Sequence, residues 1–138
     1  DRVVFLGTVA PEDMETRVYR NCDALLVTSY WETGPIIIWE AMAVGLPVVS
    51  TRYIGSGMEA GLADGENCLL FDIGSCVDAA AQLQRLENHE ICQRLITGGY
   101  KLVIERYSQK ASVEAWHKAF TRIINILCVQ GYFIHIIK

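Results

Sequence analysis

The strongest constraint on the fold lies between residues 24 and 50, where two short apolar runs flank a longer apolar segment. The runs at residues 24–27 and 47–50 have the length and composition of buried strands. The segment between them opens at Gly34-Pro35 and stops at Gly45. Proline suits the first position of a helix, and glycine suits the position just after its last turn. The pattern therefore predicts a strand, a helix over residues 35–44 and a second strand.

The rest of the chain continues this alternation of strands and helices. Residues 3–6 are a short apolar run that ends at Gly7, and they predict a buried strand. Pro11 opens a predicted helix with acidic residues in its first turn, basic residues in its last turn, and Met14, Val18 and Cys22 on one face. Residues 69–71 predict a further strand. Ser75 and Asp78 form a capping-box pattern that opens a predicted helix from Ser75 to about Glu87. Two more helical stretches are predicted at 89–106 and 109–127.

Repeated strand–helix–strand units predict an α/β fold. The expected form is a Rossmann-like parallel sheet of about four strands, with right-handed crossovers, helices on both faces and a helical C-terminal third. In such sheets ligands bind at the carboxyl ends of the strands. Three loops, at residues 7–10, 29–32 and 50–57, should therefore meet at one edge beside the start of the helix at 35–44. This edge is the predicted ligand site.

Glu40 is the one acidic residue on the apolar helix. We expect this helix to be buried because it is apolar nearly all round, and a buried carboxylate costs several kcal/mol unless donors satisfy it. The donors could be an Arg or Lys side chain, backbone N–H groups or the hydroxyls of a ligand, and an internal ion pair remains as open as a ribose. The free N–H groups of Ile36 and Ile37 favour an anion nearby. Glu32, taken alone, is more typical of an acid placed near a helix N-terminus.

Composition excludes several classes of protein. A hydrophobic content of 51% with 20% charged residues describes a globular chain. The net charge of −4 argues against a nucleic-acid partner, because phosphate backbones require clustered Lys and Arg. The five cysteines are odd in number and lack a C-x-x-C pair, which argues against a disulfide framework or a zinc site. They favour a reducing compartment, and we expect the protein to be cytoplasmic.

The residues around Glu40 resemble a known family. The sequence shows E-x7-E from Glu32 to Glu40, followed by A-M-A-x-G-x-P-V-V-x-T, with V-V-F-L-G at 3–7, Ser29 two residues before Trp31, and D-G-E-N-x-L-L at 64–70. This pattern is similar to the donor-binding, C-terminal half of retaining GT-B glycosyltransferases of the family 4, or glycosyl transferases group 1, type. The resemblance covers roughly residues 3–120.

The resemblance implies a function and roles for individual residues. The chain would be the donor-binding domain of an enzyme that moves a hexose-type sugar, with retention, from a UDP or GDP sugar to an acceptor in polysaccharide biosynthesis. Glu40 would hold the ribose, and Glu32 would lie against the transferred sugar as the catalytic residue. No metal or cofactor would be needed. The resemblance further assigns donor contacts to the amides of Thr33 and Gly34 (sugar) and of Ile36 and Ile37 (diphosphate), and to Gly7, Thr8 and Val9 (base).

The chain also departs from the family pattern. Cys68 stands where the family usually has glycine, and Thr28 where it often has proline. No signal peptide opens the sequence, and the family's first βα unit, with its phosphate-binding Arg and Lys, would lie before Asp1. We therefore expect residues 1–122 to be a fragment of the sugar-nucleotide domain that is inactive without an N-terminal acceptor-binding domain. The apolar tail at 123–138 is too short and interrupted for a membrane span, which leaves peripheral membrane association in a full enzyme open.

Two other function classes remain open at this stage. One is a non-catalytic module that binds a sugar nucleotide or a protein partner, against which the intact pair of glutamates argues. The other is a sugar-nucleotide epimerase of the same fold, although the E-x7-E spacing favours transfer. A flavodoxin-like or receiver domain is less consistent with the sequence, because Glu40 on the apolar helix would have no purpose there.

Overall fold

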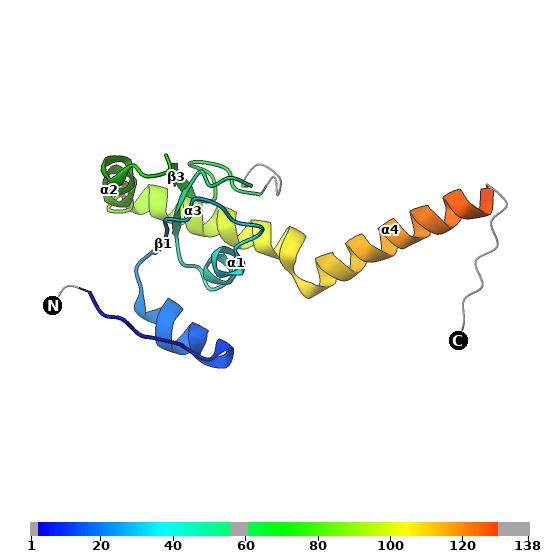
Figure 1. Cartoon of the computed structure of the whole chain (residues 1–138), viewed down its shortest axis with the longest axis horizontal. Coiled ribbons are helices and arrows are strands. Elements are labelled where there is room, and N and C mark those ends of the chain that lie inside the picture. Colours follow the sequence, from blue (N-terminus) through cyan, green and yellow to red (C-terminus); the bar gives the residue numbers. More distant parts are fainter. Residues whose placement is uncertain (1–2, 56–60, 130–138) are drawn as a thin grey trace. The chain divides into compact units, whose positions relative to one another are not determined.

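The computed structural model describes residues 3–55 and 61–129. The chain divides into two compact units, residues 1–103 and residues 104–138. The first unit holds the sheet and three α-helices (Figure 1). The parallel sheet and the helical C-terminal part confirm the predicted α/β class.

The sheet of the first unit has three parallel strands in the order β1-β2-β3. These strands are β1 (Leu25–Val27), β2 (Val48–Thr51) and β3 (Leu69–Phe71), as the apolar runs predicted. Val49 pairs with both Leu26 and Leu69, which fixes the register across the sheet. Every residue of β2 and β3 is buried because β2 is the central strand and helices cover the apolar side chains.

The helix α1 (Ile36–Ala43) connects β1 to β2. Pro35 is extended and stands just before the helix rather than inside its first turn. At the other end Leu46 N–H donates to the Ala41 carbonyl at 2.9 Å, and Gly45 N–H donates to the Met42 carbonyl at 3.2 Å. This pair of bonds is a Schellman motif, and it uses the positive φ of Gly45, which is 80°. The predicted glycine stop is therefore confirmed.

The expectation that α1 is buried on all sides is wrong. Ile38, Ala41 and Met42 are buried, but the Ile36 side chain is 68% exposed and Glu40 is exposed as well. Residues four apart share one helix face, so Ile36 and Glu40 lie together on the open side. This face of α1, which carries an apolar and an acidic side chain, is therefore not covered by the core.

The predicted buried strand at residues 3–6 is also wrong. The segment is extended, but it pairs with no strand of the described chain. Its side chains are 58% to 93% exposed. A strand needs a neighbour to satisfy its backbone groups and a covered face for its side chains, and this segment has neither in the described residues.

The helix predicted from Pro11 is a series of three short turns. A 3₁₀ turn, η1 (Pro11–Asp13), leads into a π turn, η2 (Met14–Val18), and then into a second 3₁₀ turn, η3 (Tyr19–Asn21). In the π turn the Tyr19 N–H reaches the carbonyl of Met14, five residues back. Such a turn adds a residue to the helical repeat, so Tyr19 rather than Val18 is the buried residue of this segment.

Two further helices cover the sheet. The helix α2 (Cys76–Arg85) begins where the Ser75 hydroxyl accepts from Asp78 N–H at 3.2 Å, which confirms the predicted cap. The helix α3 (His89–Leu102) begins at Asn88, whose side chain accepts from two backbone N–H groups. A buried cluster joins both helices to the sheet, and its members are Val49, Leu69, Phe71 and Leu95 with Ala79, Leu83, Leu86 and Ile91 packed against them.

The two glycines inside α3 mark places of close approach. The helix is continuous through Gly98 and Gly99. A Cβ atom on Gly98 would meet the backbone carbonyl oxygen of Glu66, and one on Gly99 would lie 2.9 Å from Met42 Cγ. The absence of a side chain at both positions lets α3 pack directly on α1 and on the loop before β3.

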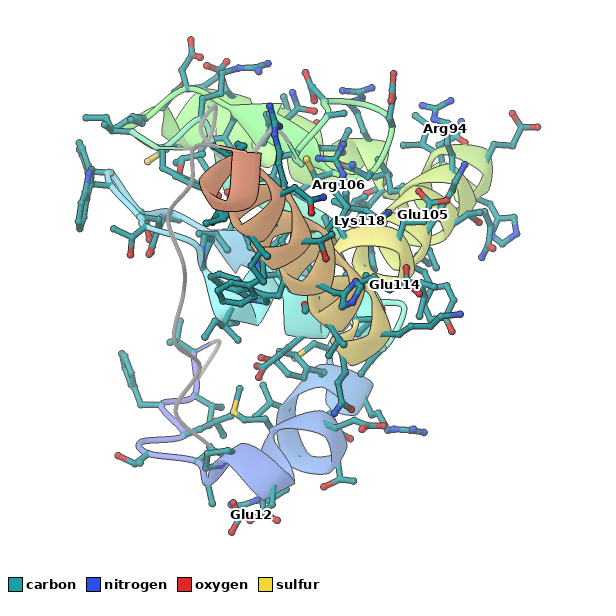
Figure 2. All side chains as sticks on the ribbon, turned by 90° about the vertical axis from the view of Figure 1, so that its right-hand side faces the viewer. Glu12, Arg94, Glu105, Arg106, Glu114 and Lys118 are labelled. Carbon is teal, nitrogen blue, oxygen red and sulfur yellow. The ribbon has the colours of Figure 1, made fainter. Side chains whose placement is uncertain are left out.

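The second unit contains one long helix. After the π turn η4 (Val103–Tyr107), the helix α4 runs over Gln109–Val129. Its charged side chains Glu114 and Lys118 lie one turn apart (Figure 2). Residues 123–129 of the expected apolar tail belong to α4, and the expectation for residues 130–138 lies outside the described residues. The helix exposes a set of large apolar side chains, which are Val113, Trp116, Phe120, Ile123, Ile124 and Ile126.

Candidate functional site

Two loops meet at the carboxyl edge of the sheet, as the topology predicted. The loop after β1 and the loop after β2 pair through a parallel bridge between Trp31 and Ile54. Ile54 N–H donates to the Tyr30 carbonyl at 3.0 Å, and Glu32 N–H donates to the Ile54 carbonyl at 3.3 Å. These bonds hold the backbone on both sides of Trp31, directly before the Glu32 side chain. The part of the third expected loop at residues 56–57 lies outside the described residues.

The Glu32 side chain is held by a neighbour in the same loop. Ser29 Oγ donates to Glu32 Oε1 at 2.6 Å. The loop is in turn tied to β2, because Thr51 Oγ1 donates to the Ser29 carbonyl at 2.6 Å. Glu32 is half-buried, and its backbone approaches Gly55 so closely that a Cβ atom there would collide with the Glu32 carbonyl oxygen. The position of this carboxylate is therefore well defined.

Glu40 has a partner that sequence reasoning did not identify. Tyr19 Oη donates to Glu40 Oε2 at 2.7 Å. The Tyr19 ring is 4% exposed, whereas Glu40 is exposed. Glu40 is therefore not a buried carboxylate, and the expectation that donors must offset the free-energy cost of its burial is wrong. Among the described residues its partner is a neutral phenol rather than the Arg or Lys of an internal ion pair.

The first turn of α1 supplies backbone donors. Ile38 N–H bonds to the Pro35 carbonyl, so the free donors that a helix start provides are those of Ile36 and Ile37. Gly34 has a φ of 132°, which turns the chain into the helix in a conformation that other residues rarely adopt. Thr33 is exposed and Gly34 is half-buried. These four residues join Glu32 to the helix start.

Glu40 belongs to the same end of α1. Side chains on a helix lean toward its N-terminus, so Glu40 reaches back along the face that carries Ile36 and Ile37. Helix geometry thus brings a carboxylate and free N–H groups together on one exposed face. The prediction of an acid beside an anion-binding helix start came from the place of Glu40 on the helix, and the face that carries Glu40 is exposed rather than buried.

Residues 7–9 do not join this arrangement through strand pairing. Gly7 and Thr8 are exposed and Val9 is half-buried. The sequence placed them at the sheet edge because residues 3–6 were expected to form a strand of the sheet. That strand is absent from the described residues, so the topological argument for their position fails.

Tyr19 is the site residue that sequence reasoning missed. A regular helix from Pro11 would have turned Met14, Val18 and Cys22 to one face. The π turn shifts this face by one residue, and Cys22 is exposed beyond the last turn. No sequence signal marks the π turn. Tyr19 could still have been selected from the sequence as an aromatic residue with a hydroxyl among charged neighbours, because a buried Tyr usually finds a hydrogen-bond partner.

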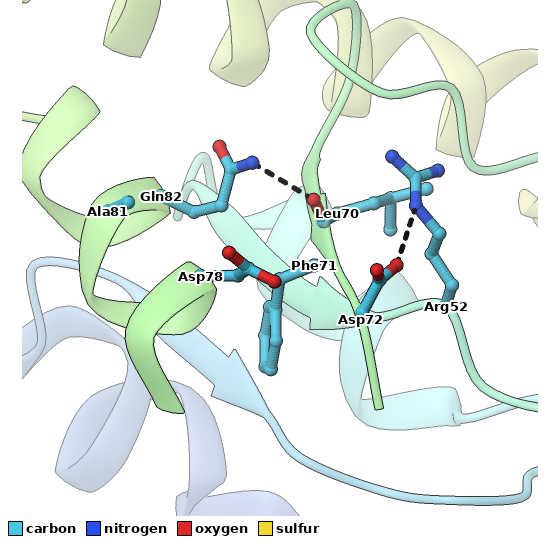
Figure 3. A pocket seen from close by; sticks show the side chains of 7 residues that line it. All are labelled: Arg52, Leu70, Phe71, Asp72, Asp78, Ala81 and Gln82. Carbon is cyan, nitrogen blue, oxygen red and sulfur yellow. Dashed lines mark hydrogen bonds and ion pairs between the residues drawn. The ribbon is translucent and has the colours of Figure 1, made fainter. Parts of the chain in front are cut away.

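A second polar pocket lies at the carboxyl end of β3. It has a volume of about 220 Å³ and is lined by Arg52, Leu70, Phe71, Asp72, Asp78, Ala81 and Gln82 (Figure 3). Gln82 Nε2 donates to the Leu70 carbonyl at 3.1 Å, and Arg52 Nε lies 3.8 Å from Asp72 Oδ1. Gln82, Arg52 and Asp72 thus interact within the protein. None of the residues predicted for the site lines it.

The described residues give no sign of a metal centre. Within residues 3–55 and 61–129, no group of three or more His, Cys, Asp or Glu side chains is arranged to hold a metal ion. Four cysteines of this part of the chain, Cys22, Cys68, Cys76 and Cys92, carry free thiols. No described helix combines the length and the hydropathy needed to span a membrane.

Comparison with known proteins decides the family. Residues 1–102 match the family described as glycosyl transferases group 1. The chain belongs to this family. It is 34% identical over 122 residues to the D-inositol 3-phosphate glycosyltransferase of Corynebacterium jeikeium (strain K411), covering 88% of the chain. It spans 28% of that relative's length, so the chain corresponds to less than a third of this group 1 glycosyltransferase.

Solved structures of other proteins share the fold. The C-terminal domain of a glycosyl transferase group 1 family protein (LpcC) from Francisella tularensis superposes with a TM-score of 0.66 at 27% identity, covering 76% of this chain and 53% of that one. Anabaena Alr3699/HepE, solved in complex with UDP-glucose, gives a TM-score of 0.64 at 21% identity, covering 76% and 29%. The fold is that of the C-terminal half of a GT-B glycosyltransferase, as the sequence predicted.

Proposed function

We propose that this chain is the donor-binding domain of a glycosyltransferase that uses a nucleotide-diphosphate sugar and transfers a hexose-type sugar with retention. The observation that carries the proposal is the pair of carboxylates beside the start of α1. Glu32 and Glu40 each accept one bond from a neutral hydroxyl, at 2.6 Å and 2.7 Å. Neither bond neutralises a charge, so both carboxylates stay able to accept further bonds from ligand hydroxyls.

The two carboxylates and the helix start suit different parts of a sugar nucleotide. A carboxylate that accepts two O–H bonds is well matched to a vicinal diol, so Glu40 is assigned to the ribose. The free N–H groups of Ile36 and Ile37 suit the diphosphate, because a helix start attracts anions. Glu32 is assigned to the transferred sugar, together with the amides of Thr33 and Gly34. Residues 7–9 remain our proposal for the base.

The rest of the catalytic apparatus in this proposal comes from an acceptor-binding domain. Transfer needs a second substrate, and we assign no acceptor site to the residues described here. The apolar side chains on α4, among them Trp116 and Phe120, are the surface that we assign to packing against such a domain. We place the activity in the cytoplasm and in polysaccharide biosynthesis, without a metal ion or a further cofactor.

The test measures UDP and UDP-glucose binding to the complete gene product and to two variants. Glu40→Gln should weaken both ligands equally, because the ribose is common to them. The loss of charge-assisted bonds to a diol should be about ten- to a hundredfold in affinity. Glu32→Gln should leave UDP affinity unchanged and remove only the additional affinity that the glucose moiety provides. GDP and GDP-mannose replace these ligands if UDP does not bind.

The control variant is Glu87→Gln, which changes an exposed acid beyond the end of α2. It should bind all ligands as the wild type does. If Glu40→Gln binds them with wild-type affinity, the ribose assignment is wrong. If no nucleotide binds the wild-type protein at all, the donor-binding function itself is wrong.

A further inference from the structure

Tyr19 connects the N-terminal helical turns to the predicted ribose-binding residue. Its ring is 4% exposed, and its hydroxyl donates to Glu40 Oε2 at 2.7 Å. The two residues are twenty-one positions apart in the chain. The bond therefore depends on the packing of η3 near α1, and it does not follow from the E-x7-E spacing. Burial holds the Tyr19 ring in place. Its hydroxyl can therefore hold the exposed side chain of Glu40 in one position.

The chemistry of this partner distinguishes it from an ion pair. A phenol donates one hydrogen bond and adds no positive charge, so the negative charge of Glu40 is left for a ligand. Burial, followed by the bond to Glu40 and its negative charge, raises the pKa of Tyr19 above its ordinary value of 10.0. The phenol is therefore protonated, and able to donate, at neutral pH.

The bond to Tyr19 engages one oxygen of Glu40, which is Oε2. The second carboxylate oxygen, Oε1, has acceptor capacity of its own for a ligand hydroxyl. An exposed glutamate has three rotatable side-chain bonds, and a ligand that binds it must immobilise them. A partner that already fixes one oxygen reduces this entropic cost before the ligand arrives.

We propose that Tyr19 is a positioning residue for nucleotide binding, which holds the Glu40 carboxylate so that its second oxygen faces the ribose diol. The inference rests on the proposed function, because it acts only through the contact between Glu40 and the ribose. It predicts that the Tyr19 hydroxyl contributes to the affinity for ligands that carry the diol and contributes nothing for ligands that lack it.

The experiment compares UDP with 2′,3′-dideoxy-UDP on the complete gene product. Tyr19→Phe keeps the buried ring and removes only the hydroxyl. It should weaken UDP binding by about threefold to tenfold, in line with the cost of ordering one long side chain, and leave dideoxy-UDP binding unchanged. In a Glu40→Gln background the same substitution should have no further effect on UDP. A general loss of folding would weaken the binding of UDP and of dideoxy-UDP alike. Comparing the two ligands on one variant therefore separates a folding defect from the loss of the Tyr19–Glu40 contact.

The control is Tyr100→Phe, which removes a hydroxyl from an exposed tyrosine on α3 in the same unit, outside the loops at the carboxyl edge of the sheet. It should show no selective loss of UDP over dideoxy-UDP. Three results would overturn the role of Tyr19: wild-type or tighter UDP binding by Tyr19→Phe, an equal loss of both ligands, or the same selective loss in Tyr100→Phe. If Glu40→Gln itself binds UDP normally, the proposed ribose contact fails and the role of Tyr19 fails with it.

Discussion

Hydroxyl groups determine how the two carboxylates of the site are presented. Ser29 binds one oxygen of Glu32, and Tyr19 binds one oxygen of Glu40. In each case the donor is fixed better than the acid, because Ser29 is tied to β2 through Thr51 and Tyr19 is buried. A carboxylate with one oxygen fixed and one open is suited to bind a hydroxyl-rich ligand without first being reorganised.

Removing the Ser29 hydroxyl tests this at Glu32. Ser29→Ala should reduce the additional affinity of UDP-glucose over UDP by about threefold to tenfold, because Glu32 loses its fixed orientation toward the sugar. UDP affinity itself should not change. Titration of both ligands into the complete gene product measures the difference. Thr28→Ala removes an exposed hydroxyl from the preceding residue and serves as the control. Equal losses in the two variants would show that Ser29 has no special role.

At the residue scale, sequence reasoning selected Glu32 and Glu40 as candidates, but the reason it gave for Glu40 was wrong. An acid among apolar residues suggested an energetic problem of burial. The structure instead shows Glu40 on the exposed face of α1, with a partner from a segment far away in the sequence. Spacing along one helix can be predicted because helix geometry is regular. Contacts between segments depend on how the whole unit packs, and no local pattern encodes them.

At the scale of secondary-structure elements, glycine content decides how closely α3 packs. Gly98 faces the backbone of Glu66 and Asn67, and Gly99 faces Met42 of α1. In an exposed helix each glycine would be a weakness of about 1 kcal/mol relative to alanine. Here the missing side chains allow contacts that a Cβ atom would block. Closer packing of the core thus offsets the lower helix propensity of the two glycines.

Gly98→Ala should therefore destabilise the protein although it raises helix propensity. A Cβ atom at this position would meet the Glu66 carbonyl oxygen and lie 3.2 Å from Asn67 Cα, and backbone atoms cannot move aside as a flexible side chain can. We expect a loss of about 1–3 kcal/mol in the free energy of unfolding, measured by urea denaturation. Thr97→Ala, at an exposed neighbouring position, should instead change stability by a few tenths of a kcal/mol. A stabilised Gly98→Ala would contradict the packing argument.

The elements themselves were predictable to different degrees. The strands at 25–27, 48–51 and 69–71 and the cap at Ser75 follow from apolar runs and local hydrogen bonding, and they are confirmed. Residues 3–6 have an equally strong apolar pattern, yet they form no strand, because a strand is stable only beside a neighbour. The π turn at 14–18 also escaped prediction, because it alters the helical repeat without a distinctive composition.

At the scale of the whole molecule, the two units differ in how well they cover their apolar residues. The first unit buries a core between the sheet and its helices. The helix α4 of the second unit exposes Trp116 and Phe120, whose rings stack with centroids 5.6 Å apart. The fold class of the first unit followed from the order of its elements. The exposure of the α4 rings does not follow from the order of the elements, because exposure depends on how separate segments pack.

The core of the first unit also contains an ionisable group. Cys68 is fully buried directly before the first residue of β3. Burial, and secondarily the negative charge of Asp64, raises the pKa of the Cys68 thiol from its ordinary value of 9.0 to about 12. A thiol with a raised pKa is largely protonated at neutral pH and is a poor nucleophile. Its ionisation is therefore linked to unfolding of the whole unit.

Stability should consequently fall in alkaline solution. The native state keeps the Cys68 proton to a higher pH than the unfolded state, so the contribution is complete below the unfolded pKa near 9.0 and is lost as the pH rises through about 12. The slope should approach about 1.4 kcal/mol per pH unit within this window. Urea denaturation of the wild type and of Cys68→Ala across the window should show a shallower pH dependence in the variant. Cys76→Ala, at an exposed thiol, should retain the wild-type slope. An unchanged slope in Cys68→Ala would mean that Cys68 does not cause the alkaline loss of stability.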